Sequence, residues 1–559
     1  MGERLLRIFN REWSGLHEAA FLLGGTALLS QILGLVRDRL LTHQFGAGEA
    51  LDVYYAAFRI PDLLYASVAS FVAVTVLIPF LLEHIEGKSI SALREFINTI
   101  FTAFCLFMVA IIVLIFFLMP FLATFIVPGF TGEKLSEFIV LSRLLLLSPL
   151  LLGLSNLFGA VTQSLRRFFV FAAGPILYNI GIIFGIVFLM PFFGLQGVVF
   201  GVLLGALMHV FVQIPVLYAE RVPPRFVYSI HWRDVRRVVR LSIPRTIALS
   251  STNIAAMVLI ALASGMESGS IAVFTLAMNL QSIPLAIVGM SYSVAAFPTL
   301  AKLWTGGNRE QFLEQIVSAT RHILFWSFPA VILFIILRAQ IVRTILGSGA
   351  FDWTATRLTA AALALFAISV VAQNLVLLLT RALYAMGRTK LPLYANLAGG
   401  FLTIGASFFL LHLFHTSLVF RFFVETLFRV SDMSHTSVLM LPFGYSIGML
   451  ANLWILLSLL RKEFPTLLVR LKKSFLHSFS ASIGMGFVAY HSLQVFALVF
   501  DQNTLLGIFA QGFFSGVIGI CAGVFLLYLM GNRELEEIRI ALHHKFWRRK
   551  PIAVEPEVL

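Results

Sequence analysis

Charged residues and cysteine are both scarce in this sequence. Charged side chains make up 12% of the 559 residues, whereas soluble domains carry about 25%, so an ordinary soluble protein is excluded. The two cysteines, Cys105 and Cys521, lie far apart in apolar runs. This placement indicates two packed thiols rather than a disulfide framework or a metal site, which needs clustered ligands.

Motifs of enzyme chemistry are missing as well. The chain contains no Walker loop, no HExxH metal motif, no nucleophile elbow and no clustered carboxylate pair. We therefore expect a protein that is not an enzyme and that holds no cofactor or metal. If it moves a substrate, the energy must come from an ion gradient, the membrane potential or the substrate gradient.

Long apolar runs are abundant. Apolar residues make up 59% of the chain, and the mean hydropathy is +0.93. These runs are continuous rather than alternating, which excludes a strand barrel. The predicted fold class is an all-α polytopic membrane protein of about 14 transmembrane helices, each long enough to cross a hydrocarbon layer ~30 Å thick. We expect them near residues 19–42, 53–82, 97–127, 137–163, 168–193, 195–219, 238–265, 269–303, 320–346, 355–386, 391–414, 437–460, 476–500 and 506–530.

Basic residues are concentrated in alternate short loops, and the opposite loops at 191–197, 264–270 and 501–504 carry almost none. Under the positive-inside rule this asymmetry predicts that both termini are cytoplasmic. It explains most of the net charge of +14, so no nucleic-acid partner is predicted. The loops after the ninth and eleventh spans depart modestly from the rule. The basic loops hold Arg166 and Arg167, the lipid-attracting group Arg225, Arg233, Arg236, Arg237 and Arg240, then Arg388, Lys390, Arg461, Lys462, Arg470, Lys472 and Lys473.

A short repeat divides the chain. GPILYNIGIIFG and LPLYANLAGGFL share a Pro-x-x-x-Asn pattern, at Pro175 and Asn179 and again at Pro392 and Asn396, near the starts of the fifth and eleventh expected helices. This pattern favours two parallel six-helix repeats followed by two further helices. The predicted organisation is a first lobe over 1–220, a basic cytoplasmic connector over 221–240, a second lobe over 241–465, two additional helices over 466–530 and a cytoplasmic tail over 531–559.

The end of the first apolar run carries an unusual Arg-Asp-Arg. The stretch SQILGLVRDRLLTHQFGAGEALDVYYAAFRIPDLL, residues 30–64, resembles the first two helices of the lipid II flippase family (MurJ/MviN-like), within the multidrug/oligosaccharidyl-lipid/polysaccharide exporter superfamily. FPTLAKL at 297–303 resembles the end of the family's eighth helix. LGSGAFDWTATRLTAAALALFA at 346–367 and RALYAMGRTKLP at 381–392 resemble its tenth helix and the following turn.

The resemblance implies a function. Members of this family have fourteen helices and work by alternating access. They carry an undecaprenyl-diphosphate-linked peptidoglycan precursor from the cytoplasmic to the outer leaflet of the bacterial inner membrane. The implied partners are this precursor, membrane lipids and cell-wall synthases.

The resemblance also implies substrate-binding residues. A diphosphate needs fixed cations when it leaves water, and arginine offers a bidentate fork. Arg37 would then bind phosphate, Asp38 would orient or neutralise it, and Asp52 would act as a gating or pairing acid. The alternatives are interfacial charges at Arg37, Asp38 and especially Arg39, and a helix N-terminal acid at Asp52.

The chain departs from the family pattern at several arginines, two of which are candidate binding positions. The arginine of the family's S-R-x-L-G is Gln31 here, and the arginine of its A-D-R-L is Asn279. Both remain candidate binding positions, but neither supplies a charge. Arg245 and Arg381 are the candidate replacements. The alternatives are that Arg245 snorkels to the cytoplasmic surface and that Arg381 is structural.

The last expected helix carries Gly512, Gly516, Gly519 and Gly523. Their spacing indicates tight helix packing, while the resemblance implies a groove for the polyprenyl tail between the last two helices. Two other functions remain open. One is export of another polyprenyl-linked glycan or a drug by a related exporter, and the other is a non-transporting scaffold for cell-wall synthesis.

Overall fold

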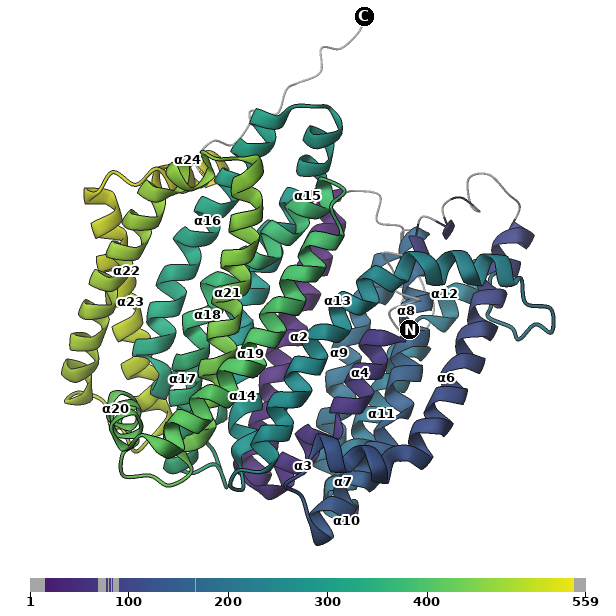
Figure 1. The fold of residues 1–559 in the computed structure, drawn as a ribbon, viewed down its shortest axis with the longest axis horizontal. Helices are drawn as coiled ribbons and strands as arrows, with labels where there is room; N and C mark the ends of the chain where they lie inside the picture. Colours follow the sequence, from purple (N-terminus) through teal and green to yellow (C-terminus); the bar gives the residue numbers. More distant parts are fainter. Residues whose placement is uncertain are drawn as a thin grey trace, which may run out of the picture. The chain divides into compact units, whose positions relative to one another are not determined.

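The computed structural model describes residues 16–68, 77–78, 80–81, 83, 90–165 and 167–546. Within this part of the chain all regular structure is helical (Figure 1), which confirms the predicted all-α class. The first helices are α2 (Leu16–Phe45), α3 (Glu49–Ala57) and α4 (Arg59–Ser67).

Ten helical segments are long and apolar enough to cross a membrane, judged over the described residues. They are Ile90–Ile126 (α6), Gly132–Ser164 (α7 Gly132–Leu145 and α8 Leu147–Ser164), Phe168–Phe193 (α9 Phe168–Phe184, η2 Gly185–Leu189 and α10 Met190–Phe193), Leu195–Ala219 (α11 Leu195–Phe211 and α12 Ile214–Ala219), Ser270–Thr305 (α14 Ser270–Pro284, η3 Leu285–Met290 and α15 Ser291–Thr305), Arg309–Ile336 (α16), Trp353–Ala385 (α18), Lys390–Thr416 (α19), Thr436–Glu463 (η4 Thr436–Leu439 and α21 Met440–Glu463) and Leu505–Leu529 (α23).

The other four expected spans fall on helices that do not meet that criterion. The span at 19–42 lies in α2, the span at 238–265 lies in α13 (Trp232–Ser264), and the span at 476–500 lies in α22 (Leu467–Ala497). The span at 53–82 begins in α3 and α4 and continues into residues outside the described part. The fold therefore agrees with the predicted architecture, and the count of fourteen stays a prediction.

Three helices do not follow the sequence expectation. The expected span at 320–346 is interrupted at Leu337, so that α16 is followed by a separate α17 (Arg338–Leu346). A short helix, α20 (Leu418–Phe428), and a charged helix, α24 (Arg533–Phe546), lie in segments expected to be a loop and a tail. Apolar run length cannot detect either, because both are short and carry charges.

The described chain forms two compact units, each built from separate stretches of sequence. Unit 1 comprises Met1–Leu280, Ile345–Leu365 and Thr389–Ala451, and unit 2 comprises Gln281–Thr344, Phe366–Arg388 and Asn452–Leu559. This division follows spatial contacts rather than the sequence repeat, so the predicted lobe boundaries stay a prediction.

Helix packing within unit 1 agrees with two repeats. The fifth expected helix of the first repeat, α9, packs against α2, the first helix of that repeat. The corresponding helix of the second repeat, α19, packs against α13, the first helix of its own repeat. The equivalent helices that carry Pro175 and Pro392 therefore have equivalent neighbours.

Glycines set the close approach of α9 and α11. A Cβ built on Gly201 would lie 2.5 Å from Gly185 Cα, and one on Gly181 would lie 2.3 Å from Gly205 Cα. Small residues allow this approach because no side chains separate the two backbones. The contact holds α9 firmly, and α9 carries Asn179, a residue of the site described below.

Candidate functional site

Arg37 and Asp38 form an ion pair on α2. The Arg37 Nε and Nη2 atoms donate to Asp38 Oδ1 at 3.0 and 2.8 Å. The side chains are 24% and 5% exposed, so Arg37 reaches open space while Asp38 is enclosed. The acid thus orients the guanidinium and neutralises its charge, which is the arrangement that the sequence predicts for these two residues.

Two asparagines from other helices complete this group. Asn279 on α14 donates from Nδ2 to Asp38 Oδ2 at 3.2 Å, and Asn179 on α9 accepts at Oδ1 from Arg37 Nη1 at 3.3 Å. Asn179 itself donates to Ser30 Oγ and to Pro175 O at 3.2 and 3.0 Å. We call Arg37, Asp38, Asn179 and Asn279 the Arg37 network.

The network has no net charge, because the one cation is matched by one anion. Asn279 stands where the resemblance expects an arginine, and its amide supports the acid instead of adding a positive charge. An anionic group that binds here must therefore compete with Asp38 for Arg37, or must bring a further cation into play. Charge-assisted bonds from arginine to phosphate are strong enough for such an exchange.

Asn179 is the member of the Arg37 network that the sequence did not single out as a candidate site residue. Its position in the Pro-x-x-x-Asn repeat marked it only as evidence for duplication. A buried amide in the middle of an apolar helix is itself a signal, since polar groups at membrane depth are costly without a partner.

Arg39 lies apart from the network. Its Nη1 donates to Ile345 O at 3.3 Å, and nearby Thr42 Oγ1 donates to Leu346 O at 2.9 Å. Both carbonyls belong to the last turn of α17, where a cation is favourably placed. Arg39 is half-buried, and the interfacial alternative for it stays a prediction.

Asp52 holds the start of another helix. Its Oδ2 accepts from Gly269 N at 2.7 Å and its Oδ1 from Ala272 N at 2.8 Å, and the residue is 2% exposed. Lys134 Nζ lies 3.8 Å from Oδ2. This agrees with the alternative of an acid at a helix N-terminus, because Asp52 lies in the first turn of its own α3 and also accepts hydrogen bonds from the start of α14.

Two other predicted residues, Gln31 and Arg381, are not brought into the network, and a third, Arg245, is not described at its side chain. Gln31 on α2 is exposed and has no hydrogen-bond partner among the described residues. Arg245 lies in α13, but its side chain is outside the described part of the chain. Arg381, in unit 2, donates from Nη2 to Met290 Sδ at 3.3 Å, a weak acceptor.

The four glycines of α23 lie at close contacts with neighbouring residues of other helices. A Cβ on Gly519 would lie 2.8 Å from Ala489 Cβ, and one on Gly523 would lie 3.1 Å from Met485 Cβ, both on α22. Gly512 and Gly516 meet Gln340 and Leu337 in the same way, at 3.0 and 3.2 Å. This geometry favours the packing alternative. An apolar cavity of about 250 Å³ between α16, α22 and α23 is lined by Gly523 alone of the four, so the lipid-tail groove stays a prediction.

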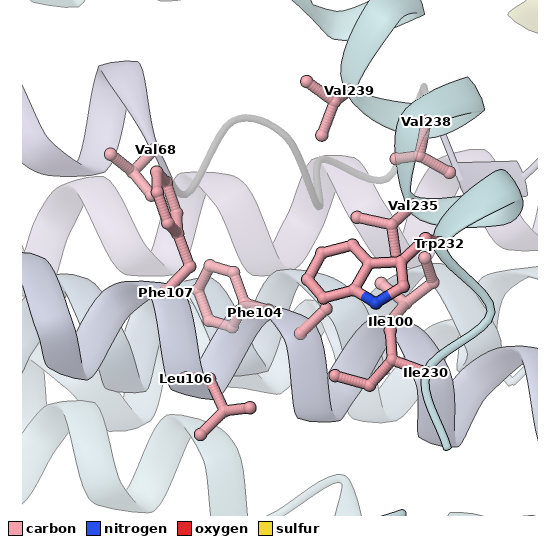
Figure 2. A pocket seen from close by; sticks show the side chains of 11 residues that line it. Val68, Ile100, Phe104, Leu106, Phe107, Ile230, Trp232, Val235, Val238 and Val239 are labelled. Carbon is pink, nitrogen blue, oxygen red and sulfur yellow. The ribbon is translucent and has the colours of Figure 1, made fainter. Parts of the chain in front are cut away.

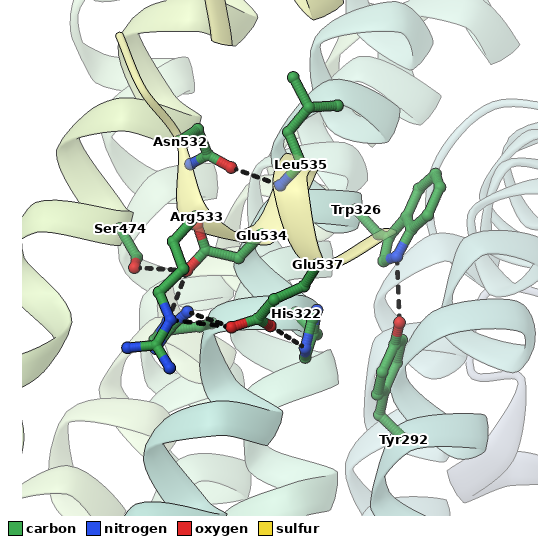
Figure 3. Close-up of polar contacts among 10 residues, drawn as sticks. Tyr292, His322, Trp326, Ser474, Asn532, Arg533, Glu534, Leu535 and Glu537 are labelled. Carbon is green, nitrogen blue, oxygen red and sulfur yellow. Dashed lines mark hydrogen bonds and ion pairs between the residues drawn. The ribbon is translucent and has the colours of Figure 1, made fainter. Parts of the chain in front are cut away.

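A cluster of hydrogen bonds and ion pairs holds α24 against its neighbours within unit 2 (Figure 3). The carboxylate of Glu534, which is 1% exposed, accepts from Arg321 Nε at 2.5 Å and from Ser474 Oγ at 2.7 Å. Glu537 lies 3.2 Å from His322 Nε2. Burial would raise the pKa of Glu534, but the hydrogen bonds from Arg321 and Ser474 outweigh it and hold that pKa below its ordinary value.

Comparison with known proteins gives one consistent family. The family model described as "Lipid II flippase MurJ" matches residues 41–419. A protein named "Probable lipid II flippase MurJ" from Buchnera aphidicola subsp. Acyrthosiphon pisum (strain APS) is 26% identical over 524 residues, covering 91% of this chain and 96% of the relative. One named "Lipid II flippase MurJ" from Burkholderia cenocepacia is 23% identical over 385 residues, covering 67% of this chain and 75% of the relative.

Solved structures agree on the fold. A structure titled "Lipid II flippase MurJ, inward closed conformation" superposes with a TM-score of 0.72 at 21% identity, covering 93% of this chain and all of the other. An inward-facing MATE family transporter of the MOP superfamily gives a TM-score of 0.63 at 16% identity, covering 78% of this chain and 95% of that one. With ten apolar helices among its described residues, the chain is a multi-pass protein of the inner membrane. Because the family model matches more than half of its length, the chain belongs to the lipid II flippase MurJ family.

Proposed function

We propose that this protein carries lipid II, the undecaprenyl-diphosphate-linked peptidoglycan precursor, from the cytoplasmic to the outer leaflet by alternating access and without a catalytic step. Membership of the family and the names of the relatives support the substrate. The single observation that carries the proposal is the Arg37 network, because it holds a partly exposed guanidinium among α2, α9 and α14.

The network suggests how a diphosphate is bound. Substrate phosphate takes the place of Asp38 on the guanidinium, and Asn179 keeps the arginine in position. Asp38, released from Arg37, remains hydrogen-bonded to Asn279. The acid therefore lowers the cost of burying Arg37 while the carrier is empty, and the substrate replaces it when the carrier is loaded.

We propose further that both termini are cytoplasmic and that an ion gradient or the membrane potential drives the cycle. The basic loops on one side of the sequence support the orientation. Contacts with cell-wall synthases stay a prediction.

A second candidate is a carrier for another polyprenyl-linked glycan. Asn279 favours it, because the network lacks the second arginine that the family pattern has, and a substrate with less phosphate charge would need fewer cations. The likeness to a MATE transporter supports the shared fold and gives no independent support to a drug substrate.

The deciding experiment is complementation of a bacterium depleted of its essential lipid II flippase. The wild-type chain should restore growth, and the double variant Arg37→Gln/Asp38→Asn should not, although both reach the membrane at equal levels. If the expressed wild-type chain does not restore growth, the other glycan becomes the better proposal. If the double variant supports growth as well as the wild type, transport does not depend on the Arg37 network.

A further inference from the structure

The start of α13 in unit 1 has two different faces. Arg233, Arg236, Arg237 and Arg240 recur at helical spacing, and all are exposed. Trp232, Val235, Val238 and Val239 recur on another side of the same turns. A short basic amphipathic helix of this kind is typical of segments that lie at a membrane surface.

The apolar side faces a cavity of about 560 Å³, within the range of ligand pockets. Figure 2 shows Trp232, Phe104 and Phe107 projecting toward the same space. All the residues that line it are apolar: Val68 from α4; Ile100, Ala103, Phe104, Leu106 and Phe107 from α6; and Ile230, Trp232, Val235, Val238 and Val239 from the start of α13.

A second hollow adjoins the first. It is lined by Trp232 together with the four arginines of α13. Because Trp232 lines both, the apolar pocket and the arginines adjoin at this side chain and together make a site with an apolar part and a cationic part. We call it the α13 site.

Three of the four arginines of this site have no anionic partner among the described residues. Arg237 is engaged, since it lies 3.4 Å from Glu83 and stacks over the ring of Phe80 at 4.9 Å. Arg233, Arg236 and Arg240 make no hydrogen bond or ion pair with any residue that the structure describes. Three guanidinium groups side by side repel one another unless an anion lies between them.

The connector before α13 is held along α6 by hydrogen bonds, so the position of the site is fixed by specific contacts. Arg94 on α6 donates from Nη2 to Arg221 O at 2.6 Å. Asn98 and Thr102 accept the backbone N–H groups of Arg225 and Val227 at 2.9 and 3.1 Å. These bonds hold the first turn of α13 against α6 at the place where the pocket lies.

The position of the pocket indicates its occupant. It lies against the first half of α6, a membrane-spanning helix, and is lined by Leu106 and Phe107, which are 58% and 51% exposed. In a membrane such exposed side chains face hydrocarbon, so a lipid chain is the molecule already present there. A purely apolar pocket cannot choose among lipids, because their chains are equally apolar. The adjoining arginines can select a lipid by the negative charge of its headgroup.

We propose that the α13 site binds one anionic phospholipid of the cytoplasmic leaflet. One acyl chain lies in the apolar pocket beside Trp232, and the phosphate lies on Arg233, Arg236 and Arg240. The site is separate from the Arg37 network, and the proposal does not depend on the transported substrate.

The test uses the fluorescence of Trp232 in the full-length protein. Wild type and Trp232→Phe are reconstituted in phosphatidylethanolamine vesicles with a minor fraction of brominated phosphatidylglycerol or of brominated phosphatidylethanolamine. Bromine quenches tryptophan on contact, and the difference between the two proteins isolates Trp232. We expect brominated phosphatidylglycerol to quench this residue more strongly than brominated phosphatidylethanolamine.

Two variants test the cationic part. Arg233→Gln/Arg236→Gln/Arg240→Gln should lose the preference for phosphatidylglycerol. The matched control Arg461→Gln/Lys472→Gln/Lys473→Gln removes the same charge from exposed positions in unit 2 and should keep it. Loss of the preference in both variants would show a general charge effect, and the proposal would fail.

Two other results would also overturn the proposal. Equal quenching of wild-type Trp232 by both brominated lipids would mean that the headgroup is not recognised. Relief of quenching by a low concentration of an undecaprenyl diphosphate lipid would make the site part of the substrate path instead. The assay measures no transport, so its failure leaves the proposed function untouched.

Discussion

Two arginines separated by a single residue have different partners in this protein. Arg37 pairs with Asp38 and Asn179, whereas Arg39 reaches the last turn of α17. Positions two apart on a helix point about 200° away from each other, so both arginines cannot serve one ligand. The sequence motif identifies the stretch, and the helix geometry then distinguishes the two side chains.

Removing Arg37 alone should disturb folding as well as transport. Asp38 would be left enclosed with Asn279 as its remaining partner among the described residues, and breaking a buried pair costs ~3–5 kcal/mol. Because Arg37 is partly exposed, we expect about 2 kcal/mol for Arg37→Ala in a thermal unfolding assay. The double variant Arg37→Gln/Asp38→Asn should unfold close to the wild type yet fail to transport.

Conservative and neighbouring changes complete that test. Arg37→Lys should restore transport only in part, since an ammonium cannot reproduce the bidentate fork. Arg39→Ala should leave most transport intact. If Arg39→Ala proves the more damaging of the two, the phosphate site is not at Arg37.

Asp52 should behave as a structural residue. Asp52→Ala leaves the backbone N–H groups of Gly269 and Ala272 without their acceptor, which costs about 1–3 kcal/mol for each unsatisfied group. Glu49→Ala, in the same helix with an exposed side chain, should cost less than about 0.5 kcal/mol. Both are measured as shifts of the unfolding temperature in detergent. Equal shifts would contradict the assigned role.

At the scale of the helices, run length predicts where segments lie but not how they end or bend. Run length does not mark the break at Leu337 or the π-helical turn η3 after Pro284, because the expected spans continue through both. Helix α24 escapes prediction for another reason. Its docking depends on Arg321, more than two hundred residues earlier in the chain.

The glycines of α23 allow a packing test. Gly519→Ala should lower the unfolding temperature, because the new methyl group would lie 2.8 Å from Ala489 Cβ. Gly405→Ala is the matched control, since Gly405 is also helical and has no atom within 4 Å of the added Cβ. That change should be neutral or stabilise the helix by about 0.5–1 kcal/mol. A neutral Gly519→Ala would mean that α22 and α23 are less tightly packed than described.

Docking of α24 should depend on the charge of Glu534. A carboxyl group whose pKa is lowered in the folded state stabilises the folded state at pH values above the ordinary pKa of glutamate. This stabilisation is lost as the pH falls through the lowered pKa of Glu534. Hydrogen exchange over α24 should therefore be slow at neutral pH and become faster in acid. Glu534→Gln should exchange fast at neutral pH, while Glu536→Gln, on the same helix but exposed, should match the wild type. Slow exchange in Glu534→Gln would contradict this role.

At the scale of the whole molecule, composition alone predicts the class. Low charge and long apolar runs are sufficient for an all-α membrane protein, and the N-terminal motif is sufficient for the family. The partners that Arg37, Asp38 and Asp52 have on other helices could not be predicted, because Asn179, Asn279 and Gly269 lie more than a hundred residues away in sequence. Long-range pairing of polar groups leaves no periodic signal in one sequence.

The predicted orientation has a direct test. In a background without Cys105 and Cys521, a cysteine introduced by Ser431→Cys should react with a membrane-impermeant maleimide added outside the cell. Cysteines placed near either terminus should react only after the membrane is opened. An externally labelled C-terminus would show that the helix count is wrong by an odd number.

The neutrality of the Arg37 network has an electrical consequence. A site whose positive and negative charges cancel experiences no net force from the membrane potential, so the empty carrier can change conformation without electrical work at that site. In the cycle proposed above, a diphosphate displaces Asp38, so that the loaded site carries excess negative charge, and each elementary charge crossing the field is worth about 2.3 kcal/mol per 100 mV. With the cell interior negative, that work favours outward movement, so the field acts on the loaded step and leaves the return of this site free.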